Sequence, residues 1–117
     1  MTASNPLLRS AAIMLERASK AKKAPIWIQA SKMLAAPTGL RVEVNVGRIS
    51  RIAAKDSALF VPGKVLGTGL IDKKVTVGAF SFSSAAKKKI ESSGGSAMTV
   101  EQFLKKYPDG SGVKLVK

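Results

Sequence analysis

Glycine and lysine gather in one segment of the chain, VPGKVLGTGLIDKKVTVGAF, residues 61–80, which holds four glycines and three lysines. Glycine lets main-chain N–H groups approach a ligand closely, and lysine supplies a positive point charge. Both properties suit phosphate, either of a bound nucleotide or of a nucleic-acid backbone. A second interpretation is that Gly63, Gly67 and Gly69 are turn residues with positive φ, and the sequence leaves both open.

The known nucleotide-binding motifs do not fit this segment. A Walker A loop needs two glycines separated by four residues and then Lys followed by Ser or Thr, whereas Gly63 and Lys64 are followed by two hydrophobic residues. The dinucleotide fingerprint needs a third glycine where this chain has Asp72. We therefore expect a nucleic-acid backbone rather than a nucleotide.

The residue inventory excludes several kinds of catalysis. The chain has no cysteine and no histidine, which rules out disulfides, Cys or His metal sites and the Ser-His-Asp and Cys-His triads. Its acidic residues are scattered, and Glu16 is spaced to pair with Lys20 rather than with a second carboxylate. We predict no enzymatic activity, no cofactor, no metal site and no small-molecule substrate.

The charge of the chain predicts an acidic partner. Twenty Lys and Arg against seven Asp and Glu give a net charge of +13. Residues 1–51 hold nine bases and two acids, and residues 52–117 hold eleven bases and five acids, so the excess is not confined to a tail. No stretch approaches eighteen apolar residues and no signal-peptide pattern opens the chain, so we expect a cytoplasmic protein without a membrane partner.

The first part of the chain, residues 1–38, predicts a helical hairpin. Asn5 and Pro6 suit an N-cap and a first-turn position, and apolar residues follow at spacings of three and four. A second helix is bracketed by Pro25 and Pro37.

From residue 39 the pattern changes to short strands and helices, which indicates an α/β core over residues 39–117. Pro62 and Gly63 fit the central positions of a type II turn and are expected to end a strand. The expected strands are 41–46, 58–63 and 75–80, with 112–117 as a short strand or tail.

Capping residues predict the helices of this core. Ser83 suits the N-cap of a helix that Gly94 ends, and Thr99 with Gln102 forms a capping box. A helical turn over 47–52 would bury two isoleucines and present two arginines together. The fold class predicted is a compact single α/β domain, 1–117, of irregular ββα turns with an N-terminal helical hairpin.

Candidate nucleic-acid contacts are the basic residues near these turns and the helical hairpin. Arginine offers a planar fork to phosphate and lysine a point charge, and both displace counterions from a nucleic-acid backbone. Asn45 is either a base contact or a cap of the following turn, and Trp27, beside two isoleucines, is expected in the core rather than on a base. The residues predicted to bind a nucleic-acid backbone, of DNA or RNA, are Arg9, Lys20, Lys22, Lys23, Arg41, Asn45, Arg48, Arg51, Lys64 and Lys73. At least one lysine of the run 87–89 is expected to be an ordinary solvated side chain, because the run fans over about 200° of a helix.

Three blocks of the sequence carry a family resemblance: RVEVNVGRISRIA, VPGKVLGTGLIDKKVTVGAFSFSSAAKKKIESSGG and GSGVKLVK. In order and spacing they resemble the large-subunit ribosomal protein family called eighteen-e, of archaea and eukaryotes, which is related to bacterial large-subunit protein fifteen. The resemblance runs from Pro6 to Lys117, and the short chain is similar to archaeal members.

The resemblance implies a compact α/β fold without catalysis, a place in the cytoplasmic ribosome, and binding to large-subunit rRNA and to neighbouring large-subunit ribosomal proteins. The alternative function is a general DNA- or RNA-binding protein or nucleic-acid chaperone.

Overall fold

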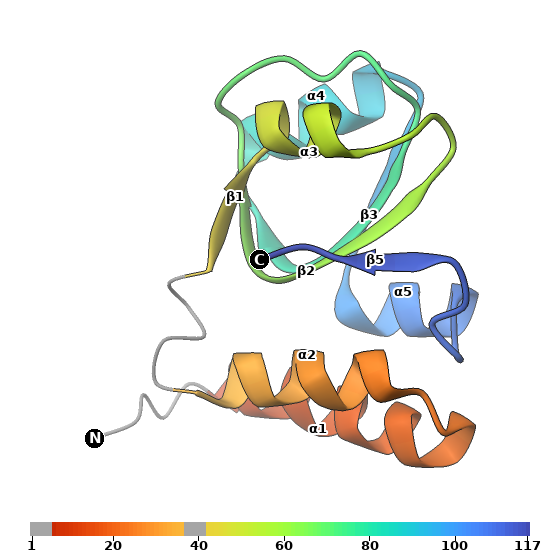
Figure 1. Cartoon of the computed structure of the whole chain (residues 1–117). Helices are drawn as coiled ribbons and strands as arrows, with labels where there is room; N and C mark the ends of the chain where they lie inside the picture. The colour runs from red at the N-terminus through yellow and green to blue at the C-terminus, as the bar shows by residue number, and fades with distance from the viewer. Residues whose placement is uncertain (1–5, 37–41) are drawn as a thin grey trace.

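The computed structural model describes residues 6–36 and 42–117 (Figure 1). Short helices and strands follow an N-terminal pair of helices, which confirms the expected mixed α/β fold. In chain order the elements are α1 (Pro6–Lys22), α2 (Pro25–Ala35), β1 (Glu43–Asn45), α3 (Val46–Ile52), β2 (Ala58–Leu66), β3 (Thr76–Phe82), α4 (Ser84–Ser92), β4 (Ser96–Met98), α5 (Val100–Lys106) and β5 (Val113–Leu115).

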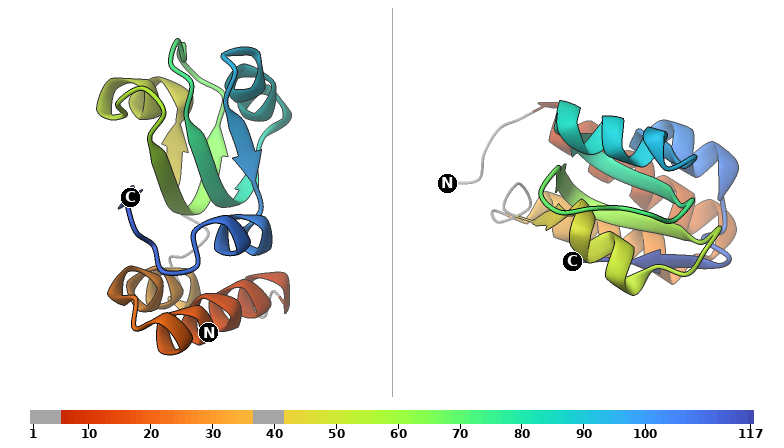
Figure 2. Two further views of the ribbon diagram at one scale, coloured as in Figure 1. Left: turned by 90° about the vertical axis from the view of Figure 1, so that its right-hand side faces the viewer. Right: turned by 90° about the horizontal axis from the view of Figure 1, so that it is seen from above.

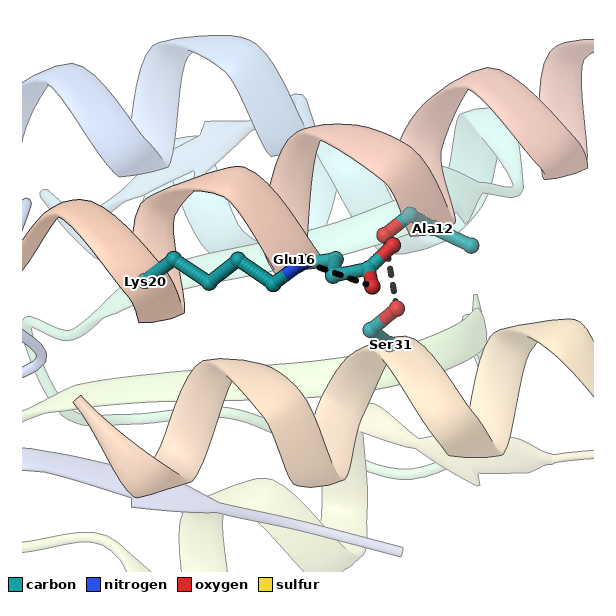
Figure 3. Close-up of polar contacts among 4 residues, drawn as sticks. All are labelled: Ala12, Glu16, Lys20 and Ser31. Carbon is teal, nitrogen blue, oxygen red and sulfur yellow. Dashed lines mark hydrogen bonds and ion pairs between the residues drawn. The ribbon is translucent and has the colours of Figure 1, made fainter. Parts of the chain in front are cut away.

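The helices α1 and α2 lie side by side and form the predicted hairpin (Figures 1 and 2). Small residues let the two backbones approach closely, because Ala12 and Ala30 are buried between larger apolar side chains. Ser31 is also buried, and its hydroxyl donates a hydrogen bond to the carbonyl of Ala12 at 2.7 Å (Figure 3). This bond satisfies the one polar side chain that α2 turns toward α1.

The strands form one sheet in which every pairing is parallel. Its order is β1-β2-β3-β4, and β5 also pairs with β2. Since β3 occupies one edge of β2 along its length, β1 and β5 share the other edge: β5 pairs with residues 58–60 and β1 with residues 64–66.

The expected turn at Pro62 and Gly63 is wrong. β2 continues through both residues to Leu66, and its register with β3 shifts by one residue between Val61 and Lys64. Proline is tolerated within a sheet at such a bulge, because no ladder hydrogen bond needs its missing N–H group. Pro62 also lies between the stretch of β2 that pairs with β5 and the stretch that pairs with β1.

Gly63 owes its position to a close contact between main chains. A Cβ atom there would collide with the backbone of Val42, whose carbonyl accepts a hydrogen bond from the N–H of Lys64 at 2.8 Å. This glycine therefore admits a neighbouring strand, which neither of the two sequence interpretations anticipated.

Alternate residues of β2 enter two different core clusters. Leu59 and Val61 pack with Ile49 of α3 and Ile90 of α4, whereas Phe60 packs with residues of α1, α2 and α5. Successive side chains of a strand point to opposite faces, so the sheet is covered by helices on both. This burial explains why β2 is a nearly continuous apolar run rather than an alternating one.

Trp27 lies fully buried in the second cluster, which confirms the predicted core position. Its ring makes edge-on contacts with Phe60 and Phe103, at centroid distances of 5.4 and 5.9 Å. Its indole N–H donates to the carbonyl of Pro108 at 3.1 Å, so the one polar atom of the side chain is satisfied.

The predicted helix caps of the core are confirmed. The Ser83 hydroxyl accepts a hydrogen bond from the N–H of Ala86 at 3.1 Å, and Gly94 follows α4 with φ +87°. Thr99 and Gln102 form the reciprocal capping box that opens α5. These caps fix where α4 leaves β3 and where α5 leaves β4.

Candidate nucleic-acid interface

The carboxyl ends of β1, β2 and β3 meet at one edge of the sheet, because the three strands are parallel neighbours. At this edge β1 leads into α3, β2 into a loop over residues 67–75, and β3 into α4 (Figure 1). Ligands of open α/β sheets bind outside the carboxyl ends of the strands. We call α3 and residues 67–74 together the α3-loop surface.

The helix α3 presents its two arginines on one face. Ile49 is buried and Ile52 is half-buried, which leaves Arg48 and Arg51 exposed together, as the spacing predicted. Asn45 occupies the N-cap position with φ −81° and ψ 149°, but its side chain makes no capping hydrogen bond. Its exposed amide thus remains available for an outside contact.

Two glycines join the loop to α3. The N–H of Gly47 donates to the carbonyl of Thr68 at 3.0 Å, and a Cβ atom on Gly69 would lie 2.7 Å from the Cα of Gly47. The Nη1 atom of Arg51 lies 3.8 Å from where a Cβ on Gly47 would stand. The guanidinium of Arg51 therefore lies next to the loop.

Lys73 lies in the loop with its ammonium turned into the protein. It donates to the carbonyls of Ser50 and Ala53 at 2.6 and 2.9 Å, at the C-terminal end of α3. A cation suits this end of a helix, where carbonyls lack partners and the dipole is negative. The carboxylate of Asp72 accepts a hydrogen bond from the Ser50 hydroxyl at 2.9 Å, so two successive loop residues are fastened to α3.

Lys89 holds the other part of the loop, a role that sequence reasoning missed. Its ammonium donates to the carbonyls of Gly67 and Gly69 at 2.6 and 2.7 Å. The sequence signal was present but ambiguous, because Lys89 belongs to a run in which Lys87 and Lys88 are exposed. No feature of the neighbouring sequence distinguishes Lys89 from the other two lysines, because its hydrogen-bond partners lie some 20 residues away.

The remaining predicted contacts lie elsewhere on the molecule. Arg9, Lys20, Lys22 and Lys23 are exposed on α1 and the turn after it; we call this group the helix-pair surface. The helices α1 and α2 lie at the opposite end of the molecule from α3 and α4 in Figure 1 and in the left view of Figure 2. Counting Asn45 with α3, the structure thus divides eight of the ten predicted residues between two surfaces rather than bringing them into one.

Two details complete the helix-pair surface. Lys20 pairs with Glu16 at 3.5 Å, as its spacing predicted, and both side chains are largely solvated (Figure 3). Arg17 is exposed on the same helix and was missed, although its separation of eight residues from Arg9 places both near one face.

One more predicted contact, Lys64, lies beside β1. Lys64 is exposed on β2 opposite Glu43 of β1. Arg41 lies outside the described residues.

Two other kinds of site are absent from the part of the chain that the structure describes. No group of three or more acidic side chains there could hold a metal ion. None of the described helices is long and apolar enough to cross a membrane.

Comparison with known proteins identifies relatives along the whole chain. Residues 27–98 match the family described as ribosomal proteins 50S-L15 and 50S-L18e together with their 60S counterpart. A protein of Archaeoglobus fulgidus named "Large ribosomal subunit protein eL18" is 44% identical over 116 residues, covering 99% of both chains.

Two further relatives carry the same name. The protein of Methanoregula boonei is 40% identical over 113 residues, covering 97% of this chain and 93% of the relative. The protein of Halobacterium salinarum is 38% identical over 117 residues, covering both chains completely. These matches confirm the resemblance seen in the sequence, and this chain belongs to the family of ribosomal proteins 50S-L15 and 50S-L18e and their 60S counterpart.

Proposed function

We propose that this protein is a structural constituent of the large ribosomal subunit, rather than an enzyme, and that it binds large-subunit rRNA through Arg and Lys contacts to backbone phosphates. Family membership and relatives named as large-subunit proteins support the first part. The place of action is then the cytoplasmic ribosome, and its partners are large-subunit rRNA and neighbouring ribosomal proteins.

The main observation that supports RNA binding is the exposure of the basic side chains. Every described Lys and Arg is exposed except Lys73 and Lys89, which donate to main-chain carbonyls. Ion pairs neutralise only Lys20 and Lys105 among the described residues. So much unneutralised like charge opposes compaction of the free protein, whereas a polyanion that lies against it relieves the repulsion.

The α3-loop surface supplies the more structured of the two proposed contacts. The planar guanidinium groups of Arg48 and Arg51 can each donate two hydrogen bonds to a phosphate. The Asn45 amide can donate to a base or a phosphate at the same end of the sheet. Lys73 contributes to this surface by holding its loop against α3. Two of the three N–H groups of its ammonium already donate to carbonyls, so it has little capacity left for a phosphate.

The helix-pair surface supplies the second contact. Arg9, Lys20, Lys22 and Lys23 extend along α1 and around the turn, where their flexible stems can follow a phosphate backbone. Lys64 adds charge beside β1, and Arg41, outside the described residues, remains a further predicted contact. Contacts with protein neighbours would use exposed apolar side chains, of which Leu70 is 83% exposed and Ile13 40%.

Sedimentation of the tagged full chain from its source cells tests this proposal. We expect the protein in the large-subunit fraction of a gradient, retained through a wash at moderate salt and released when the RNA is digested. A chain that remains at the top of the gradient, or that follows bulk DNA, would contradict the proposal and favour the general nucleic-acid binder.

A further inference from the structure

We infer that residues 67–70 form a main-chain phosphate-binding site, in which the N–H groups of Thr68 and Leu70 bind a phosphate of the RNA backbone. Lys89 is its positioning residue. The inference rests on the proposed function and adds to it a site made by the backbone rather than by Arg and Lys side chains.

The first step is the direction of three successive carbonyl groups. Those of Gly67 and Gly69 accept hydrogen bonds from the Lys89 ammonium, at 2.6 and 2.7 Å. That of Thr68 accepts from the N–H of Gly47 at 3.0 Å. All three carbonyls are therefore engaged by α4 or α3.

The second step is the direction of the N–H groups that follow. The described chain contains no cis peptide bond, and in a trans peptide the N–H points opposite to the preceding carbonyl. The N–H groups of Thr68 and Leu70 therefore both point away from Lys89, whereas that of Gly69 points away from Gly47 and is not part of the site. All three residues are exposed, and none of these N–H groups donates a hydrogen bond within residues 6–36 and 42–117.

The third step is the fixed shape of the loop. Gly69 has φ +94°, in the left-handed region that favours glycine, and it lies between Thr68 and Leu70. On one side its Cα lies against Gly47, and on the other a Cβ at Gly67 would meet Ala85 of α4 at 2.6 Å. The loop is thus held between two helices before any ligand arrives, which lowers the ordering cost of binding.

The fourth step is the choice of ligand. Arg48 and Arg51 of α3, Lys74 of the loop and Lys87 and Lys88 of α4 are exposed cations on the elements that carry or hold the loop. Several separate cations match an anion that repeats along a chain better than one carboxylate, so an RNA backbone fits better than an acidic peptide.

Amide NMR of the full-length protein tests the site directly. A large-subunit rRNA fragment that survives competition is titrated into the labelled protein. We expect the amide protons of Thr68 and Leu70 to shift downfield and to exchange more slowly, while the amide of Val77 in the core of the sheet stays unchanged. A fragment that binds without moving these two loop amides would overturn the site alone, and an absence of any binding fragment would overturn the proposed function.

The role of Lys89 is tested with its neighbour as control. Lys89→Met removes two charge-assisted hydrogen bonds to the loop, and we expect about tenfold weaker RNA binding, with the loop amides of the free protein shifted. Lys88→Met removes an exposed charge and should leave those free-protein amides in place. Equal weakening by both variants with unchanged loop amides would overturn the positioning role. Should Lys89→Met prevent folding, the titration of the unaltered protein decides alone.

Discussion

Replacing both arginines of α3 by alanine separates the proposed RNA contact from the stability of the fold. Arg48 and Arg51 are exposed, and neither forms an ion pair among the described residues, whereas Val46 and Ile49 anchor the helix in the core. Alanine is the best helix former, so α3 should persist in the variant. We therefore expect an unchanged circular dichroism spectrum and a melting temperature close to that of the unaltered protein.

The expected loss of binding follows from the two phosphates that these side chains would neutralise. Each phosphate contact contributes about 0.9 to the slope of log affinity against log salt, so the slope should fall by about 1.8. Charge-assisted hydrogen bonds are worth about 1.5 kcal/mol or more each, which gives a combined loss of about 3 kcal/mol. This free energy corresponds to roughly a hundredfold weaker binding.

The assay is a titration of a large-subunit rRNA fragment by fluorescence anisotropy across a salt series. Lys105→Ala with Lys114→Ala is the matched control, because it removes the same charge from α5 and β5, outside both proposed surfaces. The control should change the slope much less than the arginine variant. Unchanged slope and affinity in the arginine variant would show that α3 faces away from RNA, and equal losses in both variants would show a dependence on net charge alone.

Three further variants test the packing. Trp27→Ala should destabilise the free protein by about 3 to 5 kcal/mol, measured by denaturant unfolding, and a loss below about 1 kcal/mol would contradict its role in the core. Gly63→Ala should cost about 1 to 3 kcal/mol or more by thermal unfolding because its Cβ collides with Val42, so an unchanged midpoint would count against the close contact. Thr99→Ala should cost about 1 kcal/mol in the same measurement, and no change would mean that the capping box is dispensable.

The caps of the core could be predicted from the sequence because their bonds are local. The bond from the N–H of Ala86 to the Ser83 hydroxyl spans three residues, as do the two bonds between Thr99 and Gln102. Side chain and backbone within one helical turn then determine the geometry, whatever the rest of the chain does.

The course of β2 could not be predicted in the same way. Pro62 and Gly63 have strong turn propensity, and only the partners on either side show that they belong to a strand. Residues 113–115 and 43–45 supply those partners along one edge, from segments distant in the sequence. Tertiary pairing therefore overrides the local preference.

The candidate site was predicted only in part, for a related reason. Helical spacing sufficed to place Arg48 and Arg51 on one face. The inward course of Lys73 and Lys89 depends on main-chain carbonyls 20 to 23 residues away, which no local pattern encodes. Contact with Arg41 and the division of the chain near residue 38 fall outside the described residues and stay predictions.

Competition between rRNA and DNA tests the central claim most directly. The purified full chain is bound to large-subunit rRNA fragments in the presence of excess unrelated duplex DNA, across a salt series that includes physiological salt. We predict that at least one fragment remains bound at physiological salt, because a positioned set of contacts adds to the uniform attraction of the charge. Equal, salt-sensitive binding to every fragment and to the DNA would contradict the claim.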